Sequence, residues 1–356
     1  MNVLIKNKNG IALFLVLWVL TILSVIVGEF CHAMRTEVNI TRNFKERTQA
    51  YYIALAGINR AISELIRNEV IPRKVKSTMT DKGKETGLNR GIGRLGVEEG
   101  ARWRINVTIP PVPYGEGQFE VRIGNESGKI NINRANESML KMMFGRFDLA
   151  ENESAVIADS ILDWRDTNDL HRLNGAENDY YRSLPKPYKC KNGDFDTVEE
   201  LLMVRGITPE LFYGGLKDMV TVRKDSKLSR KVSFGNEGAG KININAASRE
   251  MLLALPMMAD DLVDKIMGYR KESDFISLND VALVVGTGVY QAILPFISLK
   301  TLSYYTITSV GKLEGSQVRQ GIEALVDIDS GPKKRCRIVQ WCDRSELGEQ
   351  SPKSEK

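Results

Sequence analysis

The stretch NGIALFLVLWVLTILSVIVGEF (residues 9–30) decides the fold, because eighteen consecutive residues in it, Ile11 to Gly28, carry no charge. A helix rises about 1.5 Å per residue and needs roughly 20 apolar residues to cross the hydrocarbon core of a bilayer. Residues 11–30 supply that length. Lys6 and Lys8 precede the stretch without a compensating acid, which places the N-terminus in the cytoplasm and the rest of the chain outside.

The same stretch differs from a secretion signal that is removed. Such a signal has a shorter apolar region that ends at a small-x-small cleavage site. Here the chain continues beyond Phe30 with apolar residues at helical spacing, and no proline occurs before Pro72. We therefore predict one long amphipathic helix that reaches about Glu69 and keeps its anchor. Its apolar positions are Phe44, Ala50, Tyr51, Ala54, Ile58, Ala61, Ile62 and Leu65.

Length and composition indicate a globular protein of roughly two domains. The chain has 356 residues, of which 42% are hydrophobic and 27% charged, and its net charge of +5 does not by itself indicate nucleic-acid binding. Four cysteines are too few for a disulfide scaffold, and none forms the CxxC spacing of a zinc site. Cys336 and Cys342 could bridge adjacent strands or a turn; the alternative is two free thiols.

An internal repeat divides the middle of the chain. GKININRANESML starts at Gly128 and GKININAASREML at Gly240, 112 residues later. Each copy predicts a short strand that leads into a helix, with Asn133 and Asn245 as helix N-caps. Helical sequence follows each copy, at residues 155–166 and 260–273.

Strand patterns flank this helical block. Residues 101–110 and 117–124 alternate apolar and polar side chains around the connection PPVPYGEG, which predicts a hairpin. Three more strands are predicted within 302–315, 316–329 and 333–343. Residues 72–100 are predicted to be an exposed loop, and the polar end of the chain to be disordered. The order indicates an α+β domain interrupted by an all-α insertion.

Side-chain oxygens concentrate in residues 161–196, ILDWRDTNDLHRLNGAENDYYRSLPKPYKCKNGDFD. Calcium takes six to eight oxygen ligands, so such a loop could hold it; a solvated acidic surface is the alternative. The D-W-x-D-x-N spacing is similar to an EF-hand but lacks its glycine and terminal glutamate. The candidate ligands are Asp163, Asp166, Asn168, Asp169, Asn174, Glu177, Asn178, Asp179, Asp194 and Asp196.

No catalytic signature stands out. The two histidines, His32 and His171, are too few for a histidine zinc site, and GxSxG, HExxH and GxxxxGK[ST] motifs are absent from the sequence. We therefore predict that the protein is not an enzyme and has no catalytic residues. A membrane hydrolase that depends on calcium is a remaining alternative, which loss of an activity on chelation would reveal.

The segment LLMVRGITPELF (residues 201–212) looks like a helix-hairpin-helix, a module that holds DNA phosphates on backbone amides. A membrane-anchored DNA receptor of a competence-like system is therefore the alternative function. Residues 128–222 contain 12 Lys or Arg and 16 Asp or Glu, a net charge of −4 that argues against DNA. In the simpler interpretation the hairpin packs helices around Leu201, Leu202, Val204, Ile207 and Leu211.

The N-terminus resembles that of type IV prepilins, with a basic leader that ends at Gly10 and a mature protein that starts at Ile11. The resemblance implies cleavage after Gly10 by a prepilin peptidase and methylation of the new amine. Prepilin-like proteins usually carry Glu at the fifth mature position, whereas this chain has Leu15. A subunit at the filament tip has no neighbour above it whose amine needs that carboxylate.

Nearly the whole chain resembles the minor pseudopilin K family of type II secretion. The resemblance is carried by GIALFLVLWVL, TQAYYIALAGINRAI, both GKININ copies, DWRDTND followed by GAENDYY, and TVEELLMVRGIT. It implies a pilin-like fold with a large inserted helical domain that contains helix-hairpin-helix-like units. The implied parts are a leader (1–10), a membrane span (11–30), a periplasmic helix (31–70), a pilin-like domain (71–123 and 300–342), an insertion (124–299) and a disordered tail (343–356).

The same resemblance implies a role in assembly at the tip of a periplasmic pseudopilus, with the chain anchored in the bacterial inner membrane. The implied partners are minor pseudopilins I and J, the prepilin peptidase and the inner-membrane assembly platform, with the secretin or exported substrates as further contacts and no nucleic acid. Calcium is the implied cofactor. Its implied ligands are Asp163, Asp166, Asn168, Glu177 and Asp179, although Asn168 and Asn178 stand where many relatives have Asp.

Overall fold

A computed structural model describes residues 8–70, 103–223, 240–328 and 336–344. The predicted loop at 72–100 and most of the predicted tail lie outside these residues, and β9 ends at Arg344. The elements are α1 (Lys8–Val70), β1 (Val112–Tyr114), β2 (Gly117–Asn125), η1 (Glu126–Gly128), β3 (Ile130–Asn131), α2 (Glu137–Phe144), α3 (Glu151–Arg165), α4 (Asn178–Ser183), η2 (Val198–Met203), α5 (Pro209–Leu211), η3 (Phe212–Leu216), α6 (Lys217–Met219), β4 (Val220–Thr221), β5 (Ile242–Asn243), α7 (Arg249–Leu253), α8 (Asp260–Glu272), α9 (Leu278–Val285), α10 (Thr287–Ile293), β6 (Ile297–Ser298), β7 (Tyr304–Leu313), β8 (Arg319–Ile328) and β9 (Cys336–Arg344).

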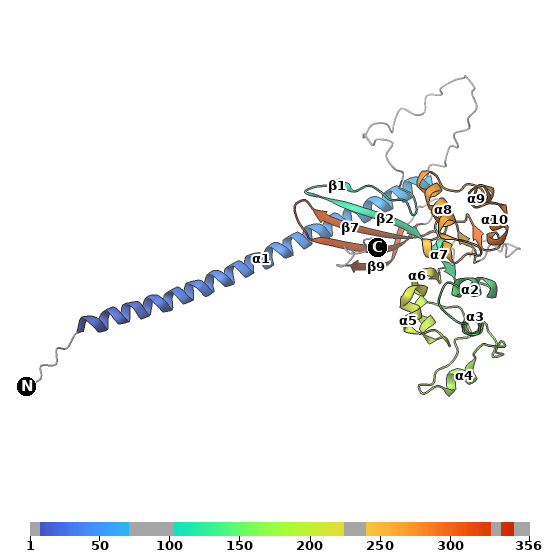
Figure 1. Ribbon diagram of the computed structural model, residues 1–356, viewed down its shortest axis with the longest axis horizontal. Helices are drawn as coiled ribbons and strands as arrows, with labels where there is room; N and C mark the ends of the chain where they lie inside the picture. The colour runs from blue at the N-terminus through green and yellow to red at the C-terminus, as the bar shows by residue number, and fades with distance from the viewer. Residues whose placement is uncertain (1–7, 71–102, 224–239, 329–335, 345–356) are drawn as a thin grey trace, which may run out of the picture.

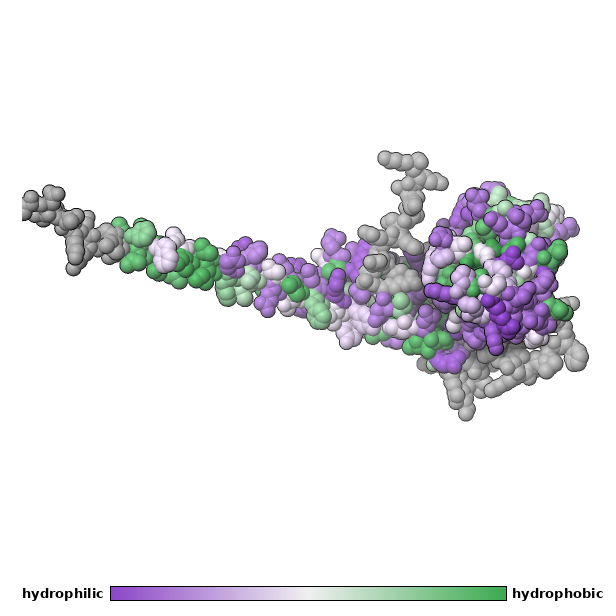
Figure 2. All heavy atoms as spheres, turned by 90° about the horizontal axis from the view of Figure 1, so that it is seen from below, coloured by the Kyte–Doolittle hydropathy of each residue, from purple (hydrophilic) through white to green (hydrophobic). Residues whose placement is uncertain are grey.

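The predicted long helix is confirmed as α1, a single helix of 63 residues that extends far beyond the rest of the molecule (Figure 1). The outer part of the protruding helix is apolar on its surface, and hydrophilic residues become frequent nearer the rest of the molecule (Figure 2). The most apolar window has a mean hydropathy of 2.5 and is 0% buried within the protein. By length and composition this part can cross a membrane.

The other half of α1 packs on an antiparallel sheet of order β1-β2-β7-β8-β9. Small residues let the helix approach closely. A Cβ on Gly311 of β7 would overlap the Ala50 carbonyl oxygen, and a Cβ on Gly57 would overlap the Ser309 hydroxyl. Buried residues of α1 such as Ile58 complete this core, whereas Phe44, expected on the same face, is 73% exposed.

The first hairpin differs from its prediction. Residues 103–111 form no strand, and the proline-containing connection itself supplies β1, which pairs with β2 through Val112 and Phe119. The alternation in 101–110 instead places Ile109 in the core beneath the sheet. Prolines on either side of Val112 limit β1 to three residues at the sheet edge.

The helical block is inserted between neighbouring strands. β2 ends at Asn125, which lies opposite Tyr305 near the start of β7, so residues 126–303 stand in place of an ordinary hairpin loop. The Asn125 side-chain amide donates to the Leu302 carbonyl at 2.9 Å and ties the two connections together. The inserted domain thus emerges from the end of the sheet near the C-terminal end of α1 (Figure 1).

The two GKININ copies build the same local structure, but their asparagines do not cap helices. The caps are Asn136 for α2 and Ser248 for α7. Asn133 exchanges two hydrogen bonds with the Phe195 backbone, and Asn245 exchanges two with the Phe275 backbone. The side-chain amide of each asparagine therefore holds a segment that is distant in the chain, around Phe195 or Phe275, against its GKININ copy.

Each copy also has a parallel strand pair and an internal arginine. β3 pairs with β4 and β5 with β6, so the insertion is not strictly all-α. Arg165 donates to the carbonyls of residues 132 and 135, and Arg270 donates to those of residues 244 and 247. Burial lowers the pKa of Arg270 to about 10.

The copies differ in one connection. Between Arg270 and Phe275 the second copy has a short link, whereas between Arg165 and Phe195 the first copy inserts the acidic loop and α4. The candidate metal ligands therefore lie in an extension that the first copy alone carries among the residues described.

Of the two alternatives for Cys336 and Cys342, the structure shows two free thiols rather than a bridge. Both thiols are free and lie six residues apart on one strand, β9. An extended strand separates such residues by roughly 20 Å, well beyond the Cα distance that a disulfide spans.

Candidate metal centre

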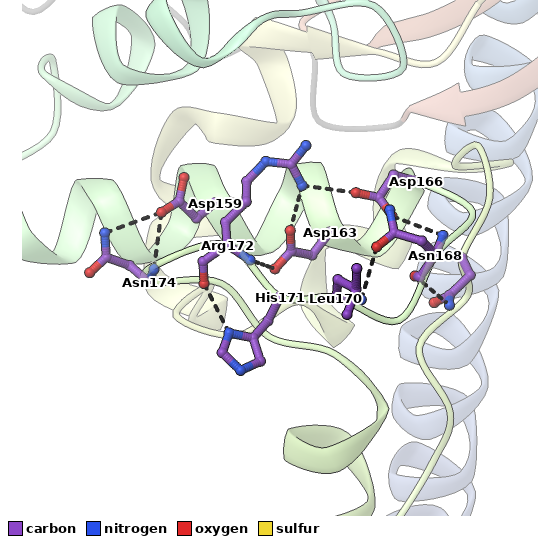
Figure 3. Close-up of polar contacts among 9 residues, drawn as sticks. Asp159, Asp163, Asp166, Asn168, Leu170, His171, Arg172 and Asn174 are labelled. Carbon is purple, nitrogen blue, oxygen red and sulfur yellow. Dashed lines mark hydrogen bonds and ion pairs between the residues drawn. The ribbon is translucent and has the colours of Figure 1, made fainter.

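The site begins on the last turn of α3, which places Asp163 inside the domain. Asp163 has 0% exposed surface, and Asp166 follows it as the C-cap of the helix. The chain then turns back along α3, so that the acidic loop covers the same face (Figure 3). The backbone N–H of Arg172 donates to Asp163 Oδ2 at 3.0 Å and closes the loop.

Gly175 allows the loop to lie this close. A Cβ at that position would overlap Asp163 Oδ2. Nearby, the backbone and side-chain amides of Asn174 both donate to Asp159 Oδ2, at 3.2 and 3.1 Å (Figure 3). The loop is thus fastened at two carboxylates one helical turn apart.

Glu177 is the least satisfied group of the loop. Its side chain is 1% exposed, and neither carboxylate oxygen accepts a hydrogen bond from an N–H or O–H group of the described residues. Burial raises the pKa of Glu177 to about 7; the Cys190 thiol opposes that shift, and the charges of Asp163 and Asp166 add to it. A buried carboxylate in this state needs a cation or a proton.

Glu177 faces the two aspartates. Asp163, Asp166 and Glu177 each offer an oxygen, and these three atoms lie within 4.8 Å of one another. Burial raises the pKa of Asp163, although hydrogen bonds from Arg172 oppose this shift. Three converging carboxylates, one of them buried and unpaired, form an oxygen-donor set that suits a hard divalent cation such as calcium.

The side chains of the other two predicted ligands take part in local hydrogen bonds of the loop. The Asn168 side chain donates to Asp166 Oδ1 at 2.8 Å and accepts from the Leu170 N–H at 2.9 Å (Figure 3). Asp179 is exposed and accepts the Tyr180 N–H at 2.7 Å. Three of the five predicted ligands therefore come together in the structure, whereas Asn168 bonds to Asp166 and to the local backbone and Asp179 bonds to the local backbone.

Arg172 is the residue of this site that sequence reasoning missed. Its Nη1 lies 2.5 Å from Asp163 Oδ1 and 2.9 Å from Asp166 Oδ2 (Figure 3). Partial burial lowers its pKa, but the bonds to Asp166 and Asp163 outweigh this effect and raise it. Arg172 is the one Lys or Arg between Asp166 and Asp179, and this position was a signal that the sequence did contain.

Aromatic side chains enclose the inner side of the loop. The ring of Trp164 lies 5.1 Å from that of Tyr181 and 6.3 Å from that of Phe195, centroid to centroid. Tyr188 stacks on Tyr181 at 5.3 Å. This packing fixes the ends of the loop around the carboxylates.

The predicted helix-hairpin-helix segment packs into the core. η2 is a 3-10 helix, and the turn at Gly206 has φ +86°. Leu201, Val204 and Ile207 are buried in the core of the insertion. The simpler packing interpretation therefore accounts for their positions.

Comparison with known proteins identifies the segment that contains this site. Residues 121–225 match the family model for type II secretion system (T2SS), protein K. The resemblance to the protein K family is confirmed. The carboxylate cluster lies within the matched segment, as does the first GKININ copy.

Two curated relatives are both named type II secretion system protein K. The chain is 23% identical over 219 residues to that of Aeromonas hydrophila. It is 23% identical over 210 residues to that of Pectobacterium carotovorum subsp. carotovorum. Each alignment covers 58% of this chain and 61% of the relative's length.

One solved structure matches much of the chain in a structural comparison. It is that of the GspK-GspI-GspJ complex from the enterotoxigenic Escherichia coli type 2 secretion system, at 16% identity with a TM-score of 0.49. The match covers 85% of this chain and 99% of the other.

Proposed function

We propose that this protein is a minor pseudopilin at the tip of the type II secretion pseudopilus, acting in pseudopilus initiation and in export across the outer membrane. One observation carries the proposal. The segment that matches protein K, residues 121–225, begins in strand β2 and continues into the insertion, and the sheet to which β2 belongs packs on a helix long enough to span a membrane. The role is one of assembly rather than catalysis.

The placement of the inserted domain supports a tip position. It lies at the end of α1 opposite to the apolar, protruding part (Figure 1). With the apolar part in the inner membrane, the domain occupies the space directly beyond the sheet on the periplasmic side. A subunit that stacked its own helix there would clash with this domain, so the chain ends the filament.

The anchor fits the same role. The prepilin peptidase would cleave between Gly10 and Ile11, and methylation of the new amine would follow. Leu15 cannot pair with the amine of a neighbour, and an unpaired carboxylate at that depth would be costly. A subunit without a neighbour above it loses nothing by this substitution.

The proposed partners are minor pseudopilins I and J, together with the inner-membrane assembly platform. The solved Escherichia coli complex described above contains GspK together with GspI and GspJ. The exposed apolar face of α1 beyond the span, which includes Met34, Val38 and Phe44, offers a surface for neighbouring helices. The secretin and exported substrates are further proposed contacts of the inserted domain.

Calcium is the proposed cofactor, held by Asp163, Asp166 and Glu177. The fit rests on Glu177, a carboxylate buried beside two others that accepts no hydrogen bond from an N–H or O–H group of the described residues. The ion would supply positive charge and cross-link α3 to the loop and α4, with backbone or water oxygens completing its coordination. These residues hold the loop; they perform no chemistry on a substrate.

Co-purification tests the function directly. The full chain, extracted in detergent together with candidate pseudopilins I and J, should elute as one complex that weakens in a calcium chelator. Glu177→Gln should show the weakened behaviour even with calcium, and the exposed Glu250→Gln should not. Failure to associate with I and J, or salt-dependent retention of duplex DNA instead, would contradict the proposal and favour the DNA receptor.

A further inference from the structure

The position of Arg172 in the carboxylate cluster leads beyond the proposed site. One guanidinium nitrogen, Nη1, bridges Asp163 Oδ1 and Asp166 Oδ2 at 2.5 and 2.9 Å. Both residues belong to the group of carboxylates that could hold a metal ion. An ion that coordinates these two oxygens at about 2.3–2.6 Å would have to lie close to where the nitrogen now lies.

The guanidinium of Arg172 and a calcium ion cannot favourably occupy the carboxylate cluster together, because both are positively charged. The guanidinium carries one positive charge and a calcium ion two, and at such a separation they repel strongly in a partly buried site. The arginine also brings one positive charge to three carboxylates, and Glu177 accepts no hydrogen bond from an N–H or O–H group of the described residues. The cluster is thus better matched to a divalent cation than to the arginine that it holds.

Arg172 has a route out of the site. Its side chain is 40% exposed, whereas that of Asp163 has 0% exposure. Its backbone N–H bonds separately to Asp163 Oδ2 at 3.0 Å. The guanidinium can therefore swing into solvent while the main chain of the loop stays attached to α3.

We propose that Arg172 is an internal cation that holds the acidic loop closed without metal and that a divalent ion must displace in order to bind. This inference rests on the proposed calcium site. It assigns Arg172 two effects of opposite sign: the side chain stabilises the metal-free loop, and it weakens metal binding. A residue that merely stabilised the folded loop would instead increase both the stability of the metal-free loop and the affinity for metal.

The test compares Arg172→Gln with the unmodified full chain in detergent. Terbium serves as the probe, because oxygen ligands bind it and a nearby indole such as Trp164 can sensitise its luminescence; calcium is then titrated as a competitor. We expect Arg172→Gln to bind calcium about tenfold more tightly, because calcium then no longer has to displace a cation that is bonded to Asp163 and Asp166. In chelator, its thermal midpoint should fall below that of the unmodified chain.

Two further variants sharpen the comparison. Arg182→Gln removes the same charge from an exposed position on α4 and should leave the calcium affinity within about twofold. Arg172→Lys keeps a cation but not the planar fork, and its affinity should fall between the two. This variant also serves if Arg172→Gln does not fold.

The outcomes separate the two proposals. Unchanged or weaker calcium binding by both Arg172 variants, with normal binding by the unmodified chain, would overturn the competition while leaving the calcium site standing. Absence of terbium and calcium binding in every variant would overturn both. Binding that appears only once Arg172 is replaced would support the competition strongly.

Discussion

Glu177 yields a prediction whose sign is unusual, because replacing this buried acid should stabilise the metal-free protein. The pKa of Glu177 is about 7 in the folded chain against an ordinary value of 4.5. When the pKa of an acid is higher in the folded than in the unfolded protein, its protonated form stabilises the fold. This contribution is complete below the unfolded pKa and is lost as the pH rises through the folded pKa. The contribution of Glu177 to the free energy of unfolding of the metal-free protein should therefore fall between about pH 4.5 and 7 and remain low above pH 7.

The size of the effect follows from the shift. A difference between 4.5 and about 7 corresponds to about 3 kcal/mol at pH 8. Glu177→Gln removes the charge but buries an amide whose N–H groups need acceptors, which costs about 1 kcal/mol. We expect a net gain of about 2 kcal/mol at pH 8 in chelator, and no gain near pH 4.5.

Urea unfolding of the full chain in detergent, followed by tryptophan fluorescence at pH 4.5 and pH 8, measures this difference. The exposed Glu250→Gln is the matched control and should change stability by less than about 0.5 kcal/mol. In excess calcium the order should reverse, since the unmodified chain gains about 2.7 kcal/mol at 100 times its Kd. If Glu177→Gln proved less stable than the unmodified chain at pH 8 in chelator, the reasoning about the unpaired carboxylate would be refuted.

Local geometry gives three further predictions. Gly175→Ala should destabilise the protein by about 1–3 kcal/mol in urea unfolding, because its Cβ would overlap Asp163 Oδ2. Its control is Gly268→Ala, in mid-helix with nothing within 4 Å, which should stabilise the protein slightly in the same urea assay. Arg270→Met should cost about 2–4 kcal/mol, because the carbonyls of residues 244 and 247 lose their donor; a neutral result in urea unfolding would contradict this. Cys336 and Cys342 should both react with iodoacetamide without reductant after unfolding, and a mass loss of two hydrogens would show a bridge instead.

The elements that the sequence predicted well are those whose signal is local and periodic. An uncharged run of eighteen residues continued by apolar residues at helical spacing leaves few alternatives to α1. The strand β7 alternates strictly between buried and half-buried residues, and β8 and β9 were predicted from their apolar sequence and the glycine turns around them. Repetition of GKININ exposed the duplication, and α3 and α8 follow the two copies as expected.

Errors arose where a partner distant in the chain decides the role of a side chain. Asn133 and Asn245 have the chemistry of helix caps, yet their amides serve the backbones of Phe195 and Phe275. Nothing within a few residues of either asparagine reveals that partner. For Cys336 and Cys342 the sequence left a bridge and two free thiols open, and the choice was made by the straight strand that separates the two thiols.

At the candidate metal centre, the contributions of sequence and tertiary structure can also be told apart. By itself the sequence determined that an acidic, oxygen-rich loop follows α3, because composition is written directly in the chain. Only the tertiary structure decided that Asp163, Asp166 and Glu177 converge, that Asn168 and Asp179 turn away, and that Arg172 lies among the carboxylates. Convergence depends on how the loop folds back over α3, and that path is set by packing around Gly175 and the aromatic side chains rather than by local spacing.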